Sequence, residues 1–237
     1  MPKYYRRPPE IRRRAAGTGP ATRMLRAMHL GMLNLLLHGQ LTQFVIIAIS
    51  IVLAIALHEF GHAVADEIQG DPTARLAGRL TINPVRHLDP VGTLMIVLVG
   101  FGWGKPVPIT PSKLRNRRFG AAFVGAAGPI VNVILALIAG YFVARIDLAR
   151  SGSLMAQFLF AFLSINVLLA ILNLLPVPPL DGSRILAAIL PPDKQGIIYF
   201  LDQYGFVIVL IAALFVLPRI LTPLVDRGVN LVLRLVG

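Results

Sequence analysis

Two histidines and a glutamate share one helical turn at residues 58–62, which read His-Glu-Phe-Gly-His. Residues i and i+4 of an α-helix lie on one face, so His58 and His62 can direct ring nitrogens at a single ion with Glu59 beside it. This spacing is typical of zinc-dependent hydrolases, in which the glutamate acts as general base. The residue types that could do chemistry therefore predict a metal centre.

A hydrolytic zinc site usually takes a third protein ligand and leaves the fourth position for water. The chain has no cysteine, so the donors must be nitrogen or oxygen. Asp181 is the best candidate, because nearby prolines break the helix and Gly182 is expected to allow an unusual backbone turn. Asp66, four residues after His62, is the alternative ligand or a partner for an imidazole, unless it is a solvated carboxylate at the helix end.

Residues 44–57, directly before the motif, carry no charge. The whole chain is 56% hydrophobic and 14% charged, with a mean hydropathy of +0.72, which is too apolar for an ordinary soluble domain. We expect an all-α integral membrane protein, a polytopic bundle of about four to six transmembrane helices. The net charge of +12 lies largely in tails and loops beside apolar stretches, which favours lipid headgroups over nucleic acid.

The order of segments predicts how the motif is positioned. Residues 1–26 form a basic, disordered tail, residues 27–217 the membrane domain, and residues 218–237 an amphipathic end. Residues 41–68 form the motif helix, and a short extended or re-entrant segment follows it at residues 73–90. Residues 120–143, 154–175 and 196–217 are each long enough to span. Residues 24–38 either help to cross the bilayer or lie on its surface. The sequence does not decide between these two arrangements, nor on which side of the membrane the basic tail lies.

A basic loop at residues 113–118 favours a cytoplasmic location for the end of the molecule where the motif helix stops. That orientation places the predicted metal centre near the cytoplasmic face. We expect a multi-pass protein of the cell membrane.

Several ordered motifs resemble those of the site-2 proteases, a family of intramembrane zinc metalloproteases. The resemblance covers most of residues 41–192, and the matching motifs lie at residues 58–62, 78–90, 102–107, 127–132 and 173–182. It implies one zinc ion per chain held by His58, His62 and Asp181, with Glu59 as catalytic acid and base. The chain is most similar to the minimal members, which lack PDZ and CBS domains. The resemblance also favours Asn173 for positioning the substrate or stabilising the oxyanion.

The expected activity is hydrolysis of peptide bonds in or near transmembrane segments of other membrane proteins, for signalling or for clearing remnants. Zinc lowers the pKa of a bound water to about 7 and Glu59 takes its proton. Asn132 and the segment near Thr81 are further candidates for binding an unwound substrate, although amides such as Asn132 also join membrane helices. The alternative function is a non-enzymatic membrane protein that carries or senses a divalent metal.

Overall fold

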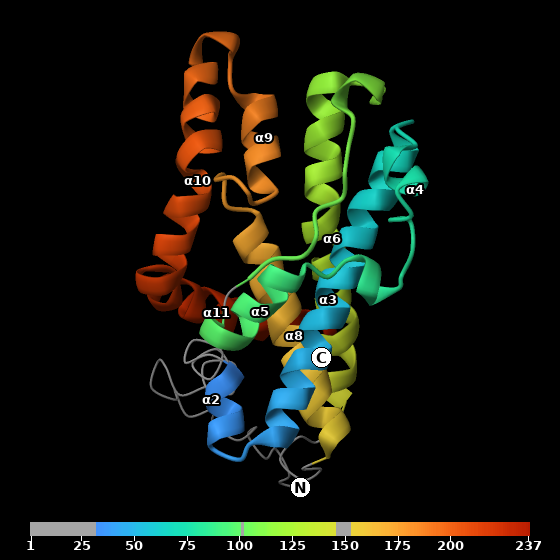
Figure 1. Cartoon of the computed structure of the whole chain (residues 1–237). Helices are drawn as coiled ribbons and strands as arrows, with labels where there is room; N and C mark the ends of the chain where they lie inside the picture. The colour runs from blue at the N-terminus through green and yellow to red at the C-terminus, as the bar shows by residue number, and fades with distance from the viewer. Residues whose placement is uncertain (1–31, 101, 146–152) are drawn as a thin grey trace, which may run out of the picture.

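The structure is a computed structural model, which describes residues 32–100, 102–145 and 153–237 (Figure 1). Over these residues it forms helices and no strand, which confirms the predicted all-α class; one isolated β-bridge pairs Leu88 with Gly104. The α-helices are α2 (Met32–Leu37), α3 (Leu41–Ile68), α4 (Thr73–Leu76), α5 (Pro90–Val99), α6 (Arg117–Arg145), α8 (Leu154–Asn173), α9 (Gly182–Ile189), α10 (Gln195–Phe215) and α11 (Leu217–Val236).

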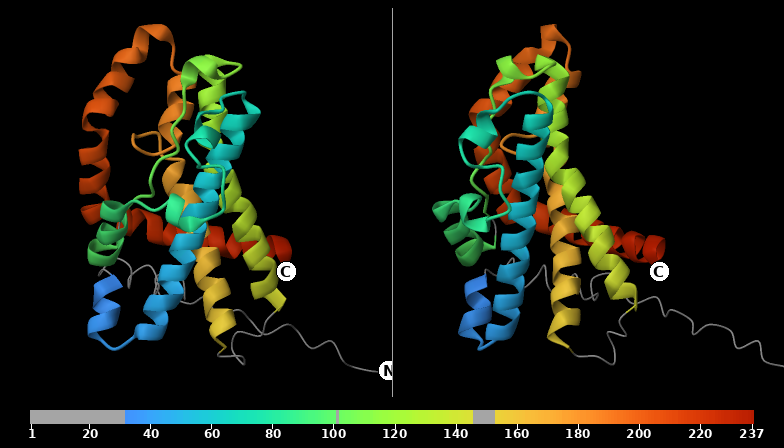
Figure 2. Two further views of the ribbon diagram at one scale, coloured as in Figure 1. Left: turned by 45° about the vertical axis from the view of Figure 1, so that its right-hand side comes forward. Right: turned by 90° about the vertical axis from the view of Figure 1, so that its right-hand side faces the viewer.

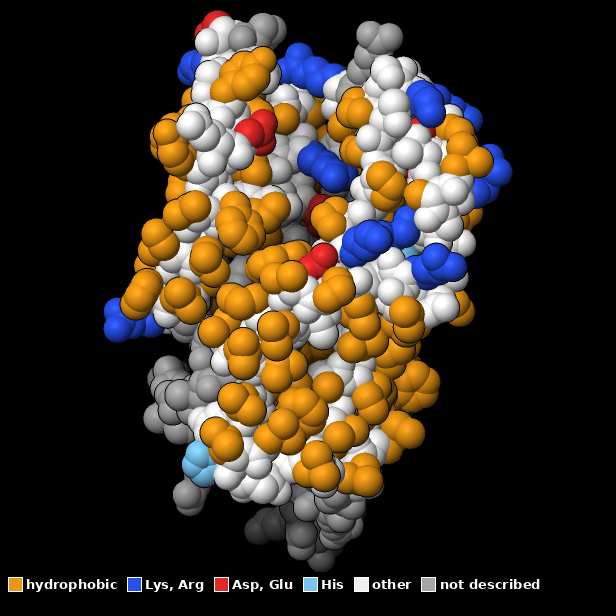
Figure 3. Space-filling view, viewed as in Figure 1, with side chains coloured by type: hydrophobic (Ala, Val, Ile, Leu, Met, Phe, Trp, Pro, Cys, Tyr) orange, Lys and Arg blue, Asp and Glu red, His pale blue; other side chains and the backbone are white. Residues whose placement is uncertain are grey.

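Among the described residues, four helices are long and apolar enough to cross a membrane, namely α3, α6, α8 and α10. Their outer surfaces keep many large hydrophobic side chains exposed, as lipid-facing helices do. In Figure 3 most of the basic side chains lie on the upper half of the visible face, whereas the lower half shows many hydrophobic side chains and few charged ones. The chain is therefore a polytopic membrane protein.

Helices α3, α6 and α8 pack together as the central bundle in all views (Figures 1 and 2). Small residues allow α3 and α6 to approach closely: a Cβ on Gly61 would lie 2.7 Å from Val131 Cγ2. The shared core includes Leu163 and Ile165 of α8 and Val225 of α11. This packing fixes the motif helix against α6.

The helix that begins with α8 is broken at the level of the motif. It ends at Asn173, residues 174–181 are irregular, and α9 then continues toward the upper end of the molecule (Figure 1). Three prolines in residues 176–179 remove backbone donors and prevent helical geometry. Irregular backbone at membrane depth must be covered by protein or line a cavity.

Residues 69–116 connect α3 to α6. The predicted extended segment at 73–90 is only partly extended, because α4 and a 3-10 helix at Pro84–Arg86 interrupt it. Helix α5 is ten residues long and too short to span, as its sequence indicates. Asp89 accepts a hydrogen bond from the Gly92 amide at its start, and Gly100 (φ 75°) ends it in the left-handed region.

The two ends of the chain are described unequally. The predicted basic tail at residues 1–26 lies outside the described residues, as do residues 27–31. Of the segment 24–38, the structure describes α2, whose six residues are too few to cross a membrane alone. At the other end, α11 is a strongly amphipathic helix that covers most of residues 218–237.

Candidate metal centre

Three side chains from distant parts of the sequence converge between α3 and the broken helix. The Nε2 atoms of His58 and His62 lie 3.1 Å apart, and Oδ2 of Asp181 lies 3.1 and 3.2 Å from them. Both histidines are buried, and Asp181 is half-buried. The structure thus brings together the three residues that the sequence suggested as ligands.

Hydrogen bonds on the far side of each ring decide which nitrogen is free to bind a metal. Nδ1 of His58 lies 2.6 Å from Oδ1 of Asn132, and Nδ1 of His62 lies 2.7 Å from the Val124 carbonyl oxygen. A carbonyl oxygen only accepts, so each Nδ1 carries the proton and donates it. Both Nε2 lone pairs therefore face the Asp181 carboxylate.

The bond from His58 is held by a second amide. Asn132 donates through Nδ2 to Oδ1 of Asn166 at 2.8 Å, and Asn166 donates through Nδ2 to the Phe162 carbonyl at 2.8 Å. The last acceptor in this series of hydrogen bonds is a backbone carbonyl, which cannot donate. Asn166 must therefore direct its side-chain oxygen toward Asn132, and Asn132 must direct its side-chain oxygen toward His58. Asn132 and Asn166 are fully buried. The relay runs across α6 and α8 and fixes both the tautomer and the orientation of His58.

This arrangement fits a divalent cation. Two imidazole lone pairs and a carboxylate that converge at about 3 Å repel one another unless a positive charge lies among them. Zinc with bonds of about 2.0–2.1 Å in tetrahedral geometry separates its donors by roughly 3.3 Å, close to the 3.1–3.2 Å observed. The three donors form one face of such a tetrahedron, which leaves a fourth position for water.

Helix α6 lies directly against the two rings. A Cβ built on Gly128 would lie 2.5 Å from His62 Nε2 and 2.6 Å from His58 Nε2, closer than real Cβ atoms approach other atoms. Only glycine fits at this position while the rings keep their places. Gly128 therefore sets how closely α6 approaches the centre.

Asp181 reaches the histidines from the residue just before α9. The prediction that Gly182 provides an unusual turn is wrong, because its φ is not positive. Gly182 is instead required for close approach: a Cβ would lie 2.5 Å from the Leu174 and Leu175 carbonyl oxygens.

Glu59 faces a cavity of about 360 Å³ that opens beside the three donors. Among the described residues, no group donates a hydrogen bond to its carboxylate, which leaves that carboxylate available to a water or a substrate. The cavity is mostly apolar and is walled in part by Trp103 and Phe206, whose rings meet edge to face 5.5 Å apart. Asn173 also lines it, and its substrate role stays a prediction.

A buried guanidinium lies close to Glu59. Arg79 is only 4% exposed and donates to the Lys105 carbonyl, in the extended segment that walls the cavity. Burial lowers the pKa of Arg79, and the Glu59 carboxylate opposes that change. The guanidinium ties the cavity wall to residues that follow the motif helix.

The other candidates lie elsewhere. Asn132 and Thr81 do not line the cavity: Asn132 supports His58, and the Thr81 carbonyl receives a bond from His87 at 2.6 Å. Asp66 is not solvated, contrary to one interpretation of its position, and is not among the convergent ligands. It is fully buried and lies 3.4 Å from the Ala74 amide. Substrate roles for Asn132 and Thr81 stay predictions.

Sequence reasoning did not find Asn166 as part of the centre, nor Trp103 and Phe206 as cavity walls. Asn166 is a single amide in an apolar helix, and its partner Asn132 is 34 positions away. Nothing in the sequence around either asparagine indicates that the two side chains are hydrogen-bonded.

Comparison with known proteins gives consistent results. Residues 141–212 match the model of peptidase family M50. YwhC of Bacillus subtilis (strain 168), named as a zinc metalloprotease, is 36% identical over 199 residues, which are 80% of this chain and 90% of YwhC. Rip2 of Mycolicibacterium smegmatis, also named as a zinc metalloprotease, is 31% identical over 191 residues, 78% of this chain and 70% of Rip2. Rip2 of Mycobacterium tuberculosis (strain H37Rv) is 32% identical over 184 residues, 75% of this chain and 69% of that protein. No solved structure matches the chain.

Proposed function

Because the chain belongs to peptidase family M50, the site-2 protease family of zinc metalloproteases, we propose that it cleaves peptide bonds in or beside transmembrane segments of other membrane proteins. The observation that carries this proposal is the convergence of His58, His62 and Asp181 beside Glu59, at the level where α8 is broken. Each of the elements that carry these residues is a membrane-spanning helix or adjoins one. The substrate is therefore expected to reach the centre from within the membrane.

His58, His62 and Asp181 would hold one zinc ion per chain. When bound, zinc supplies Lewis acidity and lowers the pKa of its water to about 7. Glu59 accepts a proton from the attacking water and delivers it to the departing amine, so that hydrolysis yields one new carboxyl and one new amino terminus. The apolar walls of the cavity exclude bulk water around the reacting carbonyl, which strengthens each electrostatic interaction there.

A transmembrane substrate must unwind before it can react, since a helix keeps its carbonyls in hydrogen bonds. Residues 102–107 are irregular apart from the isolated bridge at Gly104, and all of them except Lys105 line the cavity, where they could contact an unwound peptide. Asn173 donates through Nδ2 to the Leu169 carbonyl at 3.1 Å, which fixes its amide at the cavity edge. We assign Asn173 to substrate positioning or to stabilising the oxyanion.

The protein is proposed to lie in the cell membrane with the centre near the cytoplasmic side. Exposed basic side chains near the ends of α3 and α6, such as Lys113 and Arg115, support this orientation. Reporter fusions at Gly196 and Gly237 would test it, because Gly196 lies at the upper end of α10, with the basic loop.

The activity is tested with wild-type protein and a Glu59→Gln variant in proteoliposomes that contain single-span membrane proteins. Wild type is expected to cut within or next to a span, with the bond located by mass spectrometry. Glu59→Gln should keep its zinc and lose cleavage, while Glu67→Gln, an exposed carboxylate of the same helix, should retain both. Cleavage that survives in Glu59→Gln would contradict the assigned base. Products cut only in soluble domains would contradict the substrate class, and metal flux without cleavage would favour a metal carrier.

A further inference from the structure

The cavity beside the candidate metal centre has a polar end and an apolar end. The polar end, which the proposed chemistry uses, consists of His58, Glu59, His62 and Asp181. That chemistry gives no role to a group of apolar side chains from α3, α8 and α10 that also line the cavity. We call this group the apolar pocket, and its members are Ile55, Leu169, Leu172, Phe206 and Val209.

Helical spacing places the apolar pocket one turn away from the reacting groups. On α3, Ile55 precedes His58 by three residues and Glu59 by four. On α8, Leu169 precedes Asn173 by four residues. Residues three and four apart share one face of a helix, so both aliphatic side chains face the cavity. Both helices run from the lower to the upper end of the molecule in Figure 1, and the pocket therefore lies below the metal centre.

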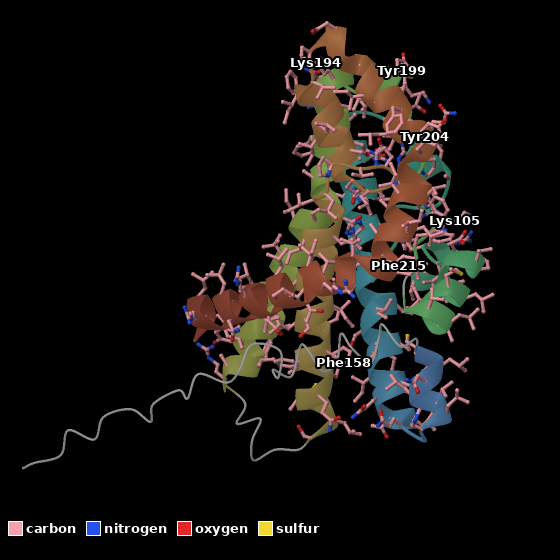
Figure 4. The ribbon with its side chains drawn as sticks, turned by 90° about the vertical axis from the view of Figure 1, so that its left-hand side faces the viewer. Lys105, Phe158, Lys194, Tyr199, Tyr204 and Phe215 are labelled. Atoms are coloured by element: carbon pink, nitrogen blue, oxygen red, sulfur yellow. The ribbon has the colours of Figure 1, made fainter. Side chains whose placement is uncertain are left out.

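Helix α10 closes the pocket from the opposite side. This helix runs downward: Figure 4 shows Tyr204 above Phe215, which lies at the lower end where α11 begins. Phe206 and Val209 lie between these two residues in the sequence and are three positions apart, so they share the face of α10 that lines the cavity. One wall of the pocket is thus carried by a helix that supplies none of the candidate metal ligands.

Backbone contacts hold the aromatic rim of the pocket in place. A Cβ on Gly92 of α5 would collide with the Trp103 carbonyl oxygen, and a Cβ on Gly205 would collide with the Pro178 carbonyl oxygen. The first contact fixes Trp103 against α5, and the second fixes α10 next to Phe206 against the segment that leads to the metal centre. The two rings meet edge to face, and Phe206 is 46% exposed. They therefore form an outer rim whose position relative to the metal centre is set.

The floor of the pocket is closed and apolar. Ile55 is 8% exposed and Val209 is 5% exposed. None of the five side chains of the pocket carries a charge, an amide or a hydroxyl group. A polar side chain that entered would lose its water without gaining a hydrogen-bond partner, whereas an apolar one would leave water favourably. The pocket can therefore discriminate by polarity and, because its floor is closed, also by size.

We propose that the apolar pocket is a substrate subsite: it binds one branched aliphatic side chain, from one of the two residues that flank the scissile bond, and Val209 of α10 limits the size that is accepted. One helical turn rises about 5.4 Å, so the pocket is within reach of a side chain next to a carbonyl at the metal centre. The inference rests on the proposed function, because the pocket gains this role only beside a scissile bond.

The test uses a single-span membrane protein that the wild type cuts, reconstituted with the enzyme in proteoliposomes. Leucine, alanine, phenylalanine or aspartate is placed in turn at each residue that flanks the cut bond, and kcat/KM is measured. At one of these two positions, alanine in place of leucine should lower kcat/KM at least about tenfold, and aspartate should lower it further. Such substitutions also change how easily the substrate unwinds. The ratio of two substrates is therefore compared between enzyme variants, in which the unwinding cost cancels.

Val209→Phe fills the pocket and should lower the leucine-to-alanine ratio at least about tenfold. Val209→Ala, which cannot clash, should raise the phenylalanine-to-leucine ratio by about as much. Val207→Phe is the matched control, because Val207 is 52% exposed and does not line the cavity; it should keep the wild-type ratios. Zinc content shows whether each variant retains its metal centre, and if Val209→Phe loses zinc, the result for Val209→Ala decides.

The outcomes separate the subsite from the proposed function. If the wild type cuts the substrates but the ratios are unchanged in the Val209 variants, the subsite is overturned and the protease function stands. The same holds if Val207→Phe changes the ratios as much as Val209→Phe does, because the effect would then not arise in the cavity. A wild type that cuts none of the substrates would overturn the proposed function and the subsite with it.

Discussion

Replacing Gly128 by alanine should disable the metal centre while leaving the fold in place. The added Cβ would lie 2.5 Å from His58 Cε1 and from His62 Nε2, whereas ordinary contacts begin near 3.4 Å. The rings, or α6, must therefore move by about 1 Å. Metal ligands tolerate displacements of only about 0.2 Å from ideal distances. Both imidazoles are displaced by the same methyl group, so neither can compensate for the other.

We expect zinc affinity to fall at least 100-fold, or about 2.7 kcal/mol, because loss of a single hydrogen-bonding partner behind a ligand already costs about 10–100-fold. Overpacking should also destabilise the fold by about 1–3 kcal/mol. The affinity is measured by competition with a chromogenic zinc chelator, and helix content by circular dichroism. Gly196→Ala is the matched control, since a Cβ there meets nothing within 4 Å. A Gly128→Ala protein with wild-type zinc affinity would refute the placement of α6 against the rings.

Two further outcomes follow from the buried polar contacts. Asn132→Leu removes the acceptor for His58 Nδ1, so zinc affinity, measured by the same competition, should fall about 10–100-fold; no change would exclude the relay. Asp71→Asn should lower the free energy of unfolding by about 1–3 kcal/mol, because the Thr110 amide loses an acceptor oxygen. Although burial would raise the pKa of Asp71, hydrogen bonds from Thr73 and Thr110 outweigh it and lower that pKa. The contribution of Asp71 is therefore complete above its unfolded pKa of 3.8 and is lost as pH falls through the lower folded pKa. The melting temperatures of wild type and Asp71→Asn should differ at pH 7 and converge at strongly acidic pH; an equal difference at both would contradict this role.

The sequence contains enough information for the spans and for the residues that converge as candidate ligands. Apolar length predicts the four long helices, and the spacing of His58 and His62 predicts that their rings meet. Asp181 was identifiable because the prolines at 176–179 break the helix just before it, so that its side chain can reach into the bundle. Each of these signals is local, extending over a few turns at most.

The supporting contacts could not be predicted in the same way. The bond from His58 to Asn132 joins residues 74 positions apart, and the Asn132–Asn166 pair depends on how α6 packs on α8. Gly182 shows a second limit: a glycine beside a turn suggests a positive φ, yet here the backbone carbonyls of residues 174 and 175 exclude a side chain. Asp66 shows a third, since a carboxylate at a helix end is ordinarily solvated, but α4 folds back and buries it.

The zinc content of purified protein, prepared without added metal or chelator, tests the three-ligand centre most directly. Wild type should carry about one zinc per chain, and Asp181→Ala should lose most of it. Asp193→Ala, which removes an exposed carboxylate at the turn before α10, should retain the wild-type content. Wild type without zinc, or Asp181→Ala with its zinc intact, would contradict the assignment of His58, His62 and Asp181 as the metal ligands.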